Sequence, residues 1–106
     1  MMSARDRHVL EIFAARLREH FPDADIWGFG SRARGDATKE SDLDVCVVVE
    51  GLKHADRQTI RYIAWEVGFE HEMLVSTVIY SKDEFEYGPY SESPLVLNIL
   101  QEGVTV

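Results

Sequence analysis

The sequence contains very little cysteine and proline, with one Cys (Cys46) and three Pro in 106 residues. A single Cys allows no disulfide within the chain, and this usage fits a reducing compartment. The sequence also lacks an apolar N-terminal stretch of the signal-peptide kind, and no run approaches about 18 apolar residues. We therefore expect a cytoplasmic globular domain that neither spans nor binds a membrane.

Positive charge is also scarce, because 11 Lys and Arg face 19 Asp and Glu, for a net charge of −8. This balance argues against binding of nucleic acid by bulk electrostatics, which needs Lys and Arg against phosphate. Residues 66–106 hold 8 of the acids and a single base, Lys82, whereas residues 1–65 are nearly neutral. The nearly neutral residues 1–65 can bind an anion, whereas the acidic residues 66–106 would repel one. The acidic stretch Asp83–Tyr90 is either a solvated loop or a docking surface for a basic partner.

The apolar pattern predicts one domain over residues 1–106, since a chain of this length can bury a core of its own. Val45–Val49 is apolar on both faces, as in a central strand that is covered on both sides. The fold class is therefore α/β, a small mixed sheet with helices packed on it. Its predicted elements, in order, are a helix from the cap Ser3 (with Asp6 in capping-box position) to Phe21, strands Ala24–Phe29 and Asp42–Val49, a helix Ala55–Gly68, a strand Met73–Tyr80, a helical turn after Ser81, and a helix from Pro94 to Gly103.

Glycine and serine gather where the first predicted strand ends, in the segment Gly28–Gly35, which reads GFGSRARG. A strand that turns here into a short helix presents free backbone N–H groups and the positive end of a helix dipole. Gly30 lets a phosphate approach the backbone, and the Ser31 hydroxyl adds a donor. Arg32 and Arg34 add positive charge. The segment predicts a phosphate-binding turn or, alternatively, a glycine-rich turn with two surface arginines.

Two acids, Asp42 and Asp44, stand at the start of the second predicted strand. Residues two apart on a strand leave the same face, with Cα atoms about 6–7 Å apart. The two carboxylates repel each other there, and a divalent cation such as Mg²⁺ would relieve the conflict. The alternative is that both acids lie in the loop before the strand, as cap or turn residues.

The glycine-serine turn and the acid pair fit a single ligand, because together they would bind a metal–triphosphate complex. The expected chemistry is an in-line displacement at phosphorus, driven by positioning and charge neutralisation. Gly28-x-Gly30-x-x-Ala33 also fits the pattern of a dinucleotide-binding turn. The chain has too few strands for that fold, and Asp42 and Asp44 come too early to hold a ribose, so this alternative is disfavoured.

The two segments GSRARG (30–35) and SDLDV (41–45) resemble the Gly-Ser…Asp-x-Asp signature of the DNA polymerase β-type nucleotidyltransferase superfamily. The order of elements and the short length are similar to its minimal nucleotidyltransferases, the MNT proteins. The resemblance implies a palm-like fold. The residues that it assigns are Gly30 and Ser31 for the triphosphate, Asp42 and Asp44 for Mg²⁺ and catalysis, and Arg32 and Arg34 as further phosphate ligands.

The same resemblance implies a reaction and a partner. A nucleoside monophosphate, AMP from ATP, would move onto a hydroxyl with release of pyrophosphate, and Mg²⁺ would be the cofactor. Many MNT proteins resemble antitoxins paired with a HEPN-type toxin, and some transfer AMP to a toxin tyrosine. We therefore expect an Mg²⁺-dependent nucleotidyltransferase whose acceptor is supplied by such a partner. Homo-oligomerisation is left open.

One position departs from that family pattern. Active members usually carry a third carboxylate on a later strand, which here is Met73–Tyr80, and this strand contains no acid. Ser76 or Thr77 stands where the acid is expected, and Glu72 just before the strand is a candidate substitute. The alternative function is therefore a catalytically weak antitoxin that neutralises its partner by binding.

Overall fold

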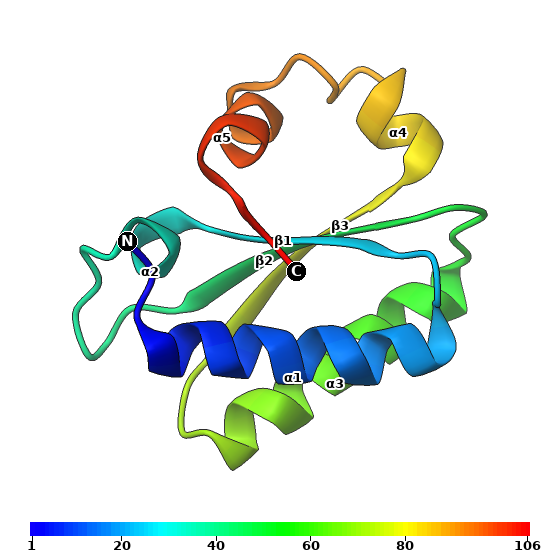
Figure 1. Cartoon of the computed structure of the whole chain (residues 1–106). Coiled ribbons are helices and arrows are strands. Elements are labelled where there is room, and N and C mark those ends of the chain that lie inside the picture. Colours follow the sequence, from blue (N-terminus) through cyan, green and yellow to red (C-terminus); the bar gives the residue numbers. More distant parts are fainter.

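The computed structural model describes residues 1–106 and shows a mixed sheet between two layers of helices (Figure 1). The strand order is β3-β2-β1-β4, with β2 and β3 parallel and the other two pairs antiparallel. The predicted α/β class is confirmed. The elements are α1 Ala4–His20, β1 Asp25–Phe29, α2 Gly30–Arg34, β2 Leu43–Val49, α3 His54–Glu70, β3 Val75–Ser81, α4 Lys82–Glu86, α5 Pro94–Glu102 and β4 Val104–Thr105.

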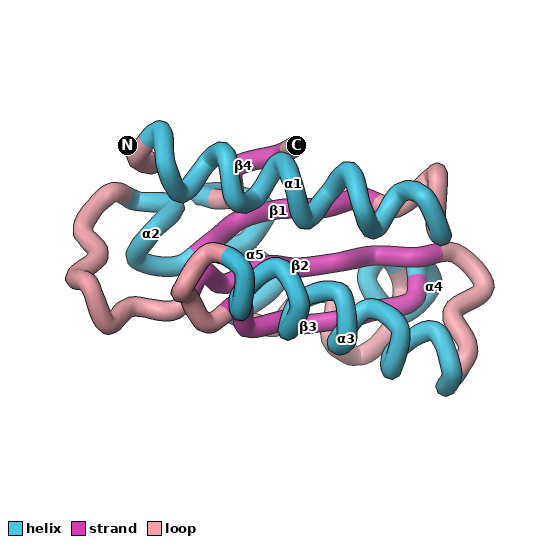
Figure 2. Tube along the Cα trace, turned by 90° about the horizontal axis from the view of Figure 1, so that it is seen from below, coloured by secondary structure: helices cyan, strands magenta, loops and turns pink.

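Helices α1 and α3 cover one face of the sheet, and α4 and α5 lie over the other (Figures 1 and 2). Successive side chains of β2 point to opposite faces, so Val45 and Val47 pack with α1 and α3. Cys46 and Val48 pack with α4 and α5 on the other face. The apolar run of β2 is thus buried on both sides, as its sequence predicts.

The register of the central strands fixes which side chains share a face at one end of the sheet. Asp44 of β2 pairs with Phe29 of β1 and with Ser76 of β3. Because directly paired residues point to the same face, these side chains lie on the side of α4 and α5. Thr77 pairs with Val45 and belongs to the opposite face.

Several predicted helix ends are confirmed. Ser81 and Glu84 form a capping box at α4, and Ser93 caps α5 with Pro94 as its first residue and Gly103 at its end. None of the helices combines the length and the apolar character needed to cross a bilayer.

Three details differ from the sequence-based expectations. Asp42 lies just outside β2, because the ladder begins at Leu43. Ser3 accepts a hydrogen bond from the Asp6 backbone, but the Asp6 carboxylate bonds elsewhere, so that capping box is only half formed. The pairing of Val104–Thr105 with β1 was not predicted, since two residues give no periodic signal.

Candidate functional site

The end of β1 turns directly into the short helix α2 through Gly30, which brings the Gly-Ser segment against β2. Gly30 has a φ of +76°, a left-handed conformation that glycine adopts at little cost. A Cβ atom at this position would overlap the Asp44 carboxylate. The turn and the acidic strand, which are separate in the sequence, therefore meet in space, and their contact requires glycine.

We expect Gly30→Ala to destabilise the protein through both backbone strain and the collision with Asp44. A non-glycine residue in such a conformation costs about 1–3 kcal/mol. Gly51→Ala is the matched control, since Gly51 has a φ of +66° with no atom near the Cβ position. Urea unfolding should show a larger loss for Gly30→Ala than for Gly51→Ala. Equal losses of unfolding free energy in the two variants would show that the Asp44 carboxylate does not collide with a Cβ atom at position 30.

Asp44 is half-buried in an environment that resists its negative charge. Burial raises the pKa of its carboxyl, the charge of Asp42 raises it further, and the positive charge of Arg34 opposes both. The two carboxylates and one guanidinium therefore lie within electrostatic reach of one another. A carboxylate that is costly to ionise beside another acid is the arrangement that a divalent cation relieves.

The raised pKa of Asp44 predicts how stability changes with pH. The folded protein binds this proton more tightly than the unfolded chain, whose carboxyl has a pKa near the reference value of 3.8. At pH values above the pKa of Asp44 in the folded protein, the ionised carboxylate therefore lowers stability. This loss of stability disappears as the pH falls toward the pKa of the unfolded chain. Asp44→Asn should be more stable than the wild type at about pH 7, by about 1 kcal/mol at most after solvent screening.

The comparison of wild type and Asp44→Asn cancels the titration of the other groups. Urea unfolding at about pH 7 and about pH 4 should show that the difference in unfolding free energy between the two proteins is smaller at the lower pH. Saturating Mg²⁺ at neutral pH should also reduce this difference in stability, because the cation, like the proton, neutralises the Asp44 carboxylate. A stability difference between the two proteins that depends on neither pH nor Mg²⁺ would contradict this description of the site.

The residues present fit a divalent metal held by two protein ligands. Mg²⁺ is commonly bound through one or two carboxylates, with waters and substrate phosphates as the other ligands. No three Asp, Glu, His or Cys side chains gather closely enough to hold a metal on their own. The chain thus offers the pair Asp42 and Asp44, and waters or the phosphates of a nucleotide would complete the coordination.

The strand register shows which of the two candidate positions, Ser76 or Thr77, lies beside Asp44. Ser76 is the register partner of Asp44 on the adjacent parallel strand, and its side chain lies on the same face. Glu72 lies instead in the turn before β3 and lines surface grooves with Asp6 of α1 and with Trp65 of α3. These neighbours belong to the α1–α3 side, and Glu72 forms no group of three metal-ligating side chains with Asp42 and Asp44.

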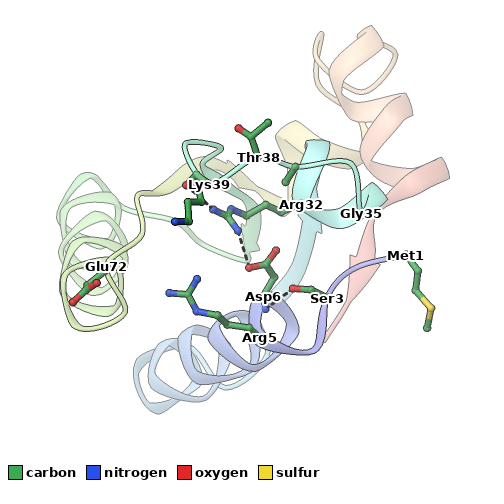
Figure 3. Close-up of a pocket in the computed structure, with 10 residues that line it drawn as sticks. Met1, Ser3, Arg5, Asp6, Arg32, Gly35, Thr38, Lys39 and Glu72 are labelled. Carbon is green, nitrogen blue, oxygen red and sulfur yellow. Dashed lines mark hydrogen bonds and ion pairs between the residues drawn. The ribbon is translucent and has the colours of Figure 1, made fainter.

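Arg32 is buried and already engaged within the fold (Figure 3). Its Nη1 lies 2.9 Å from Asp6 Oδ1, its Nε donates to the Ser41 carbonyl at 2.8 Å, and its Nη2 donates to the Lys39 carbonyl at 3.3 Å. This arrangement argues against the expected phosphate contact. The sequence signal for this pair is Asp6, which its spacing from Ser3 indicates only as a capping residue.

Arg34 remains accessible beside the acid pair. Its side chain is 46% exposed and makes loose ion pairs, 3.4 Å to Asp36 and 3.8 Å to Glu102. Exposed pairs of this kind contribute little energy and exchange readily for a stronger anion. Of the two arginines in the motif, Arg34 is therefore the one free to approach a phosphate.

The glycine turn packs against Asp44, and the mixed sheet that carries both has helices on its two faces. Residues 10–104 match the family described as nucleotidyltransferase domain. The chain belongs to this family.

Three curated relatives share part of the sequence. A candidate protein adenylyltransferase of Methanocaldococcus jannaschii, MJ0141, is 40% identical over 55 residues, which are 51% of this chain and 56% of that protein. The "Probable protein adenylyltransferase MntA" of Haemophilus influenzae is 44% identical over 41 residues, 39% of this chain and 36% of that protein. Terminal uridylyltransferase 7 of Homo sapiens is 37% identical over 49 residues, 46% of this chain and 3% of that protein. The chain thus spans 56% or less of the length of these relatives.

Solved structures share the fold. A candidate nucleotidyltransferase from Sulfolobus solfataricus has a TM-score of 0.56 and 21% identity over 95% of this chain and 81% of that chain. A toxin-antitoxin structure with AMP-PNP has a TM-score of 0.59 and 20% identity over 90% of this chain and 70% of that chain. A mutant MntA-HpeT toxin-antitoxin structure has a TM-score of 0.57 and 22% identity over 91% of this chain and 70% of that chain.

Proposed function

We propose that the protein is an Mg²⁺-dependent nucleotidyltransferase that moves AMP from ATP onto a hydroxyl of a protein partner. Pyrophosphate is the leaving group. The partner is a toxin of the HEPN type, and this chain acts as its antitoxin. The relatives named as protein adenylyltransferases and the toxin-antitoxin neighbours support this proposal.

The observation that carries the proposal is the contact between Gly30 and Asp44. A nucleotide phosphate bound by the backbone at Gly30 and the hydroxyl of Ser31 would lie beside the acid pair. A positive φ that only glycine adopts easily, next to a half-buried carboxylate, has no obvious benefit for folding. It is explained if a metal–triphosphate complex binds between the turn and the strand.

In the proposed reaction the chain's own residues bind and orient. Asp42 and Asp44 would hold the cation, Ser31 would donate to a phosphate oxygen, and Arg34 would neutralise phosphate charge. When bound, Mg²⁺ neutralises the phosphate charge and stabilises the charge that develops at the transferred phosphorus. The acceptor hydroxyl attacks the α-phosphorus, the bond to the bridging oxygen breaks, and pyrophosphate leaves with that electron pair.

The acceptor proton has no carboxylate base in this chain, since Ser76 occupies the position beside Asp44. General base assistance is typically worth about 10²–10⁴-fold in rate. The proposed enzyme is therefore slow, with the acceptor proton passing to water or to a group of the partner.

A surface suited to the partner lies on the same side of the sheet as Asp44. Helices α4 and α5 and the loop between them expose large apolar side chains next to acids that form no ion pair. These side chains are Tyr87, Tyr90, Leu95, Leu97 and Leu100, and the acids are Asp83, Glu86 and Glu92. The combination suits a partner that offers both apolar and basic groups.

The test is transfer of label from α-labelled ATP, with Mg²⁺, to the product of the neighbouring gene. Label on the partner that depends on Asp42 and Asp44 would support the proposal. An unlabelled partner, with the wild type no different from the double variant Asp42→Ala/Asp44→Ala, would refute it.

The second candidate function is neutralisation by binding alone, and the specific observation in its favour is Ser76 in place of a third acid. Under this alternative the partner is inhibited without ATP. The double variant would then inhibit the partner as well as the wild type does.

A further inference from the structure

We infer that Arg32, anchored by Asp6, is a positioning residue that fixes the backbone at Asp42 and so the direction in which its side chain leaves the chain. The inference rests on the proposed function, in which Asp42 is a metal ligand. Asp6 and Arg32 are the two charged side chains buried in the fold, with exposed fractions of 5% and 8%. They are paired with each other, across 26 positions in the sequence.

The pair joins the start of α1 to the loop that precedes Asp42 (Figure 3). Asp6 is held in the first turn of α1, where its backbone N–H donates to Ser3 Oγ at 3.1 Å. Arg32 then reaches from α2 to the loop and donates to the carbonyls of Lys39 and Ser41. Its guanidinium thus ties three separate segments together.

The bond to Ser41 acts directly on the peptide unit of Asp42. A peptide unit is planar, so fixing the Ser41 carbonyl also fixes the plane that contains the Asp42 N–H. On the other side, the Leu43 N–H donates to the Leu74 carbonyl at 2.9 Å. Both peptide planes that flank the Asp42 Cα are therefore held, although Asp42 itself lies outside the strand.

Stability alone is a weak reason to bury such a pair. Replacing a buried ion pair with apolar side chains is often neutral or stabilising, because burying both charges is costly. A metal ligand, in contrast, gains from partners that fix its orientation, and loss of such partners typically costs about 10–100-fold in metal affinity or activity. The bonds of Arg32 fit that second role.

The test measures binding of Mn²⁺, in the presence of α,β-methylene-ATP, by electron paramagnetic resonance of the free ion. Arg32→Lys keeps the positive charge but cannot reach Asp6, Lys39 and Ser41 together, and we expect Mn²⁺ affinity to fall about 10–100-fold. Asp6→Asn leaves the guanidinium its bond to Ser41, so its affinity should fall less. Saturating Mn²⁺ should restore most of the transfer rate in both variants, which a general loss of structure would not allow.

Arg16→Lys is the matched control. Arg16 also joins α1 to another element through an ion pair, 2.6 Å from Glu70 of α3, but it makes no contact with the loop before Asp42. Its Mn²⁺ affinity should equal that of the wild type.

Folded Arg32→Lys with wild-type Mn²⁺ affinity would overturn the inference. If Arg32→Lys does not fold, the near-isosteric Asp6→Asn decides, and unchanged affinity there overturns it equally. The proposed function fails separately, if the wild type binds the Mn²⁺–nucleotide complex no better than Asp44→Asn does.

Discussion

Asp44→Asn should transfer labelled AMP to the partner at least about 10³-fold more slowly than the wild type. Asp44 lies within β2, and its carboxylate packs against Gly30. Loss of a ligand removes charge stabilisation of several kcal/mol from the reaction, and about 4 kcal/mol corresponds to about 10³-fold in rate. The measurement is the initial rate of transfer at saturating ATP and Mg²⁺.

The same variant should be more stable than the wild type, as argued above, so its inactivity would not reflect unfolding. Asp23→Asn is the charge-matched control, since Asp23 is an exposed turn residue beyond the opposite end of β1. It should transfer AMP at the wild-type rate. Full activity of Asp44→Asn would remove this residue from the catalytic site and with it the central part of the proposed function.

Ser76→Asp should raise the rate of transfer, by up to about 10²-fold, the lower end of what a general base contributes. The register puts residue 76 directly beside Asp44 on the same face, and neighbouring strands are about 4.8 Å apart. A carboxylate here would add a third oxygen ligand for the cation and could accept the proton of the acceptor hydroxyl. The rate should be compared with that of the wild type across a range of Mg²⁺ concentrations.

Ser76→Asn is the control for this change, because it adds a side chain of the same size without the charge. It should leave the rate near that of the wild type. The new acid should also lower stability without metal, through repulsion by Asp44, and this loss should disappear in Mg²⁺. A Ser76→Asp protein that folds, binds Mg²⁺ more tightly and still transfers no AMP would favour the binding-only antitoxin.

These outcomes separate the two functions cleanly. Under the enzyme proposal, Asp44→Asn loses transfer and Ser76→Asp gains it. Under the binding alternative, neither change alters neutralisation of the partner, because the apolar and acidic surface of α4 and α5 is intact in both variants.

Much of the fold could be predicted from the sequence because its signals are local. Apolar residues at helical spacing, the two-faced run Val45–Val49 and the caps at Ser81 and Ser93 each act within a few residues, where backbone geometry is short-ranged. The candidate chemistry was also local, since Gly30 and Ser31 form one short motif and Asp42 and Asp44 form another. Their roles stay predictions until the variants are measured.

What the sequence by itself determined is the α/β class and the kind of chemistry to look for. Only the tertiary structure decided that Ser76, and neither Thr77 nor Glu72, is the neighbour of Asp44, because strand register depends on packing between distant segments. It also showed Arg32 buried and bound to Asp6, whereas the sequence predicts a phosphate ligand or, alternatively, a surface arginine at this position. The physical reason is the same in both cases. A side chain's face and partner are set by residues that are remote in the chain, and no local pattern records them.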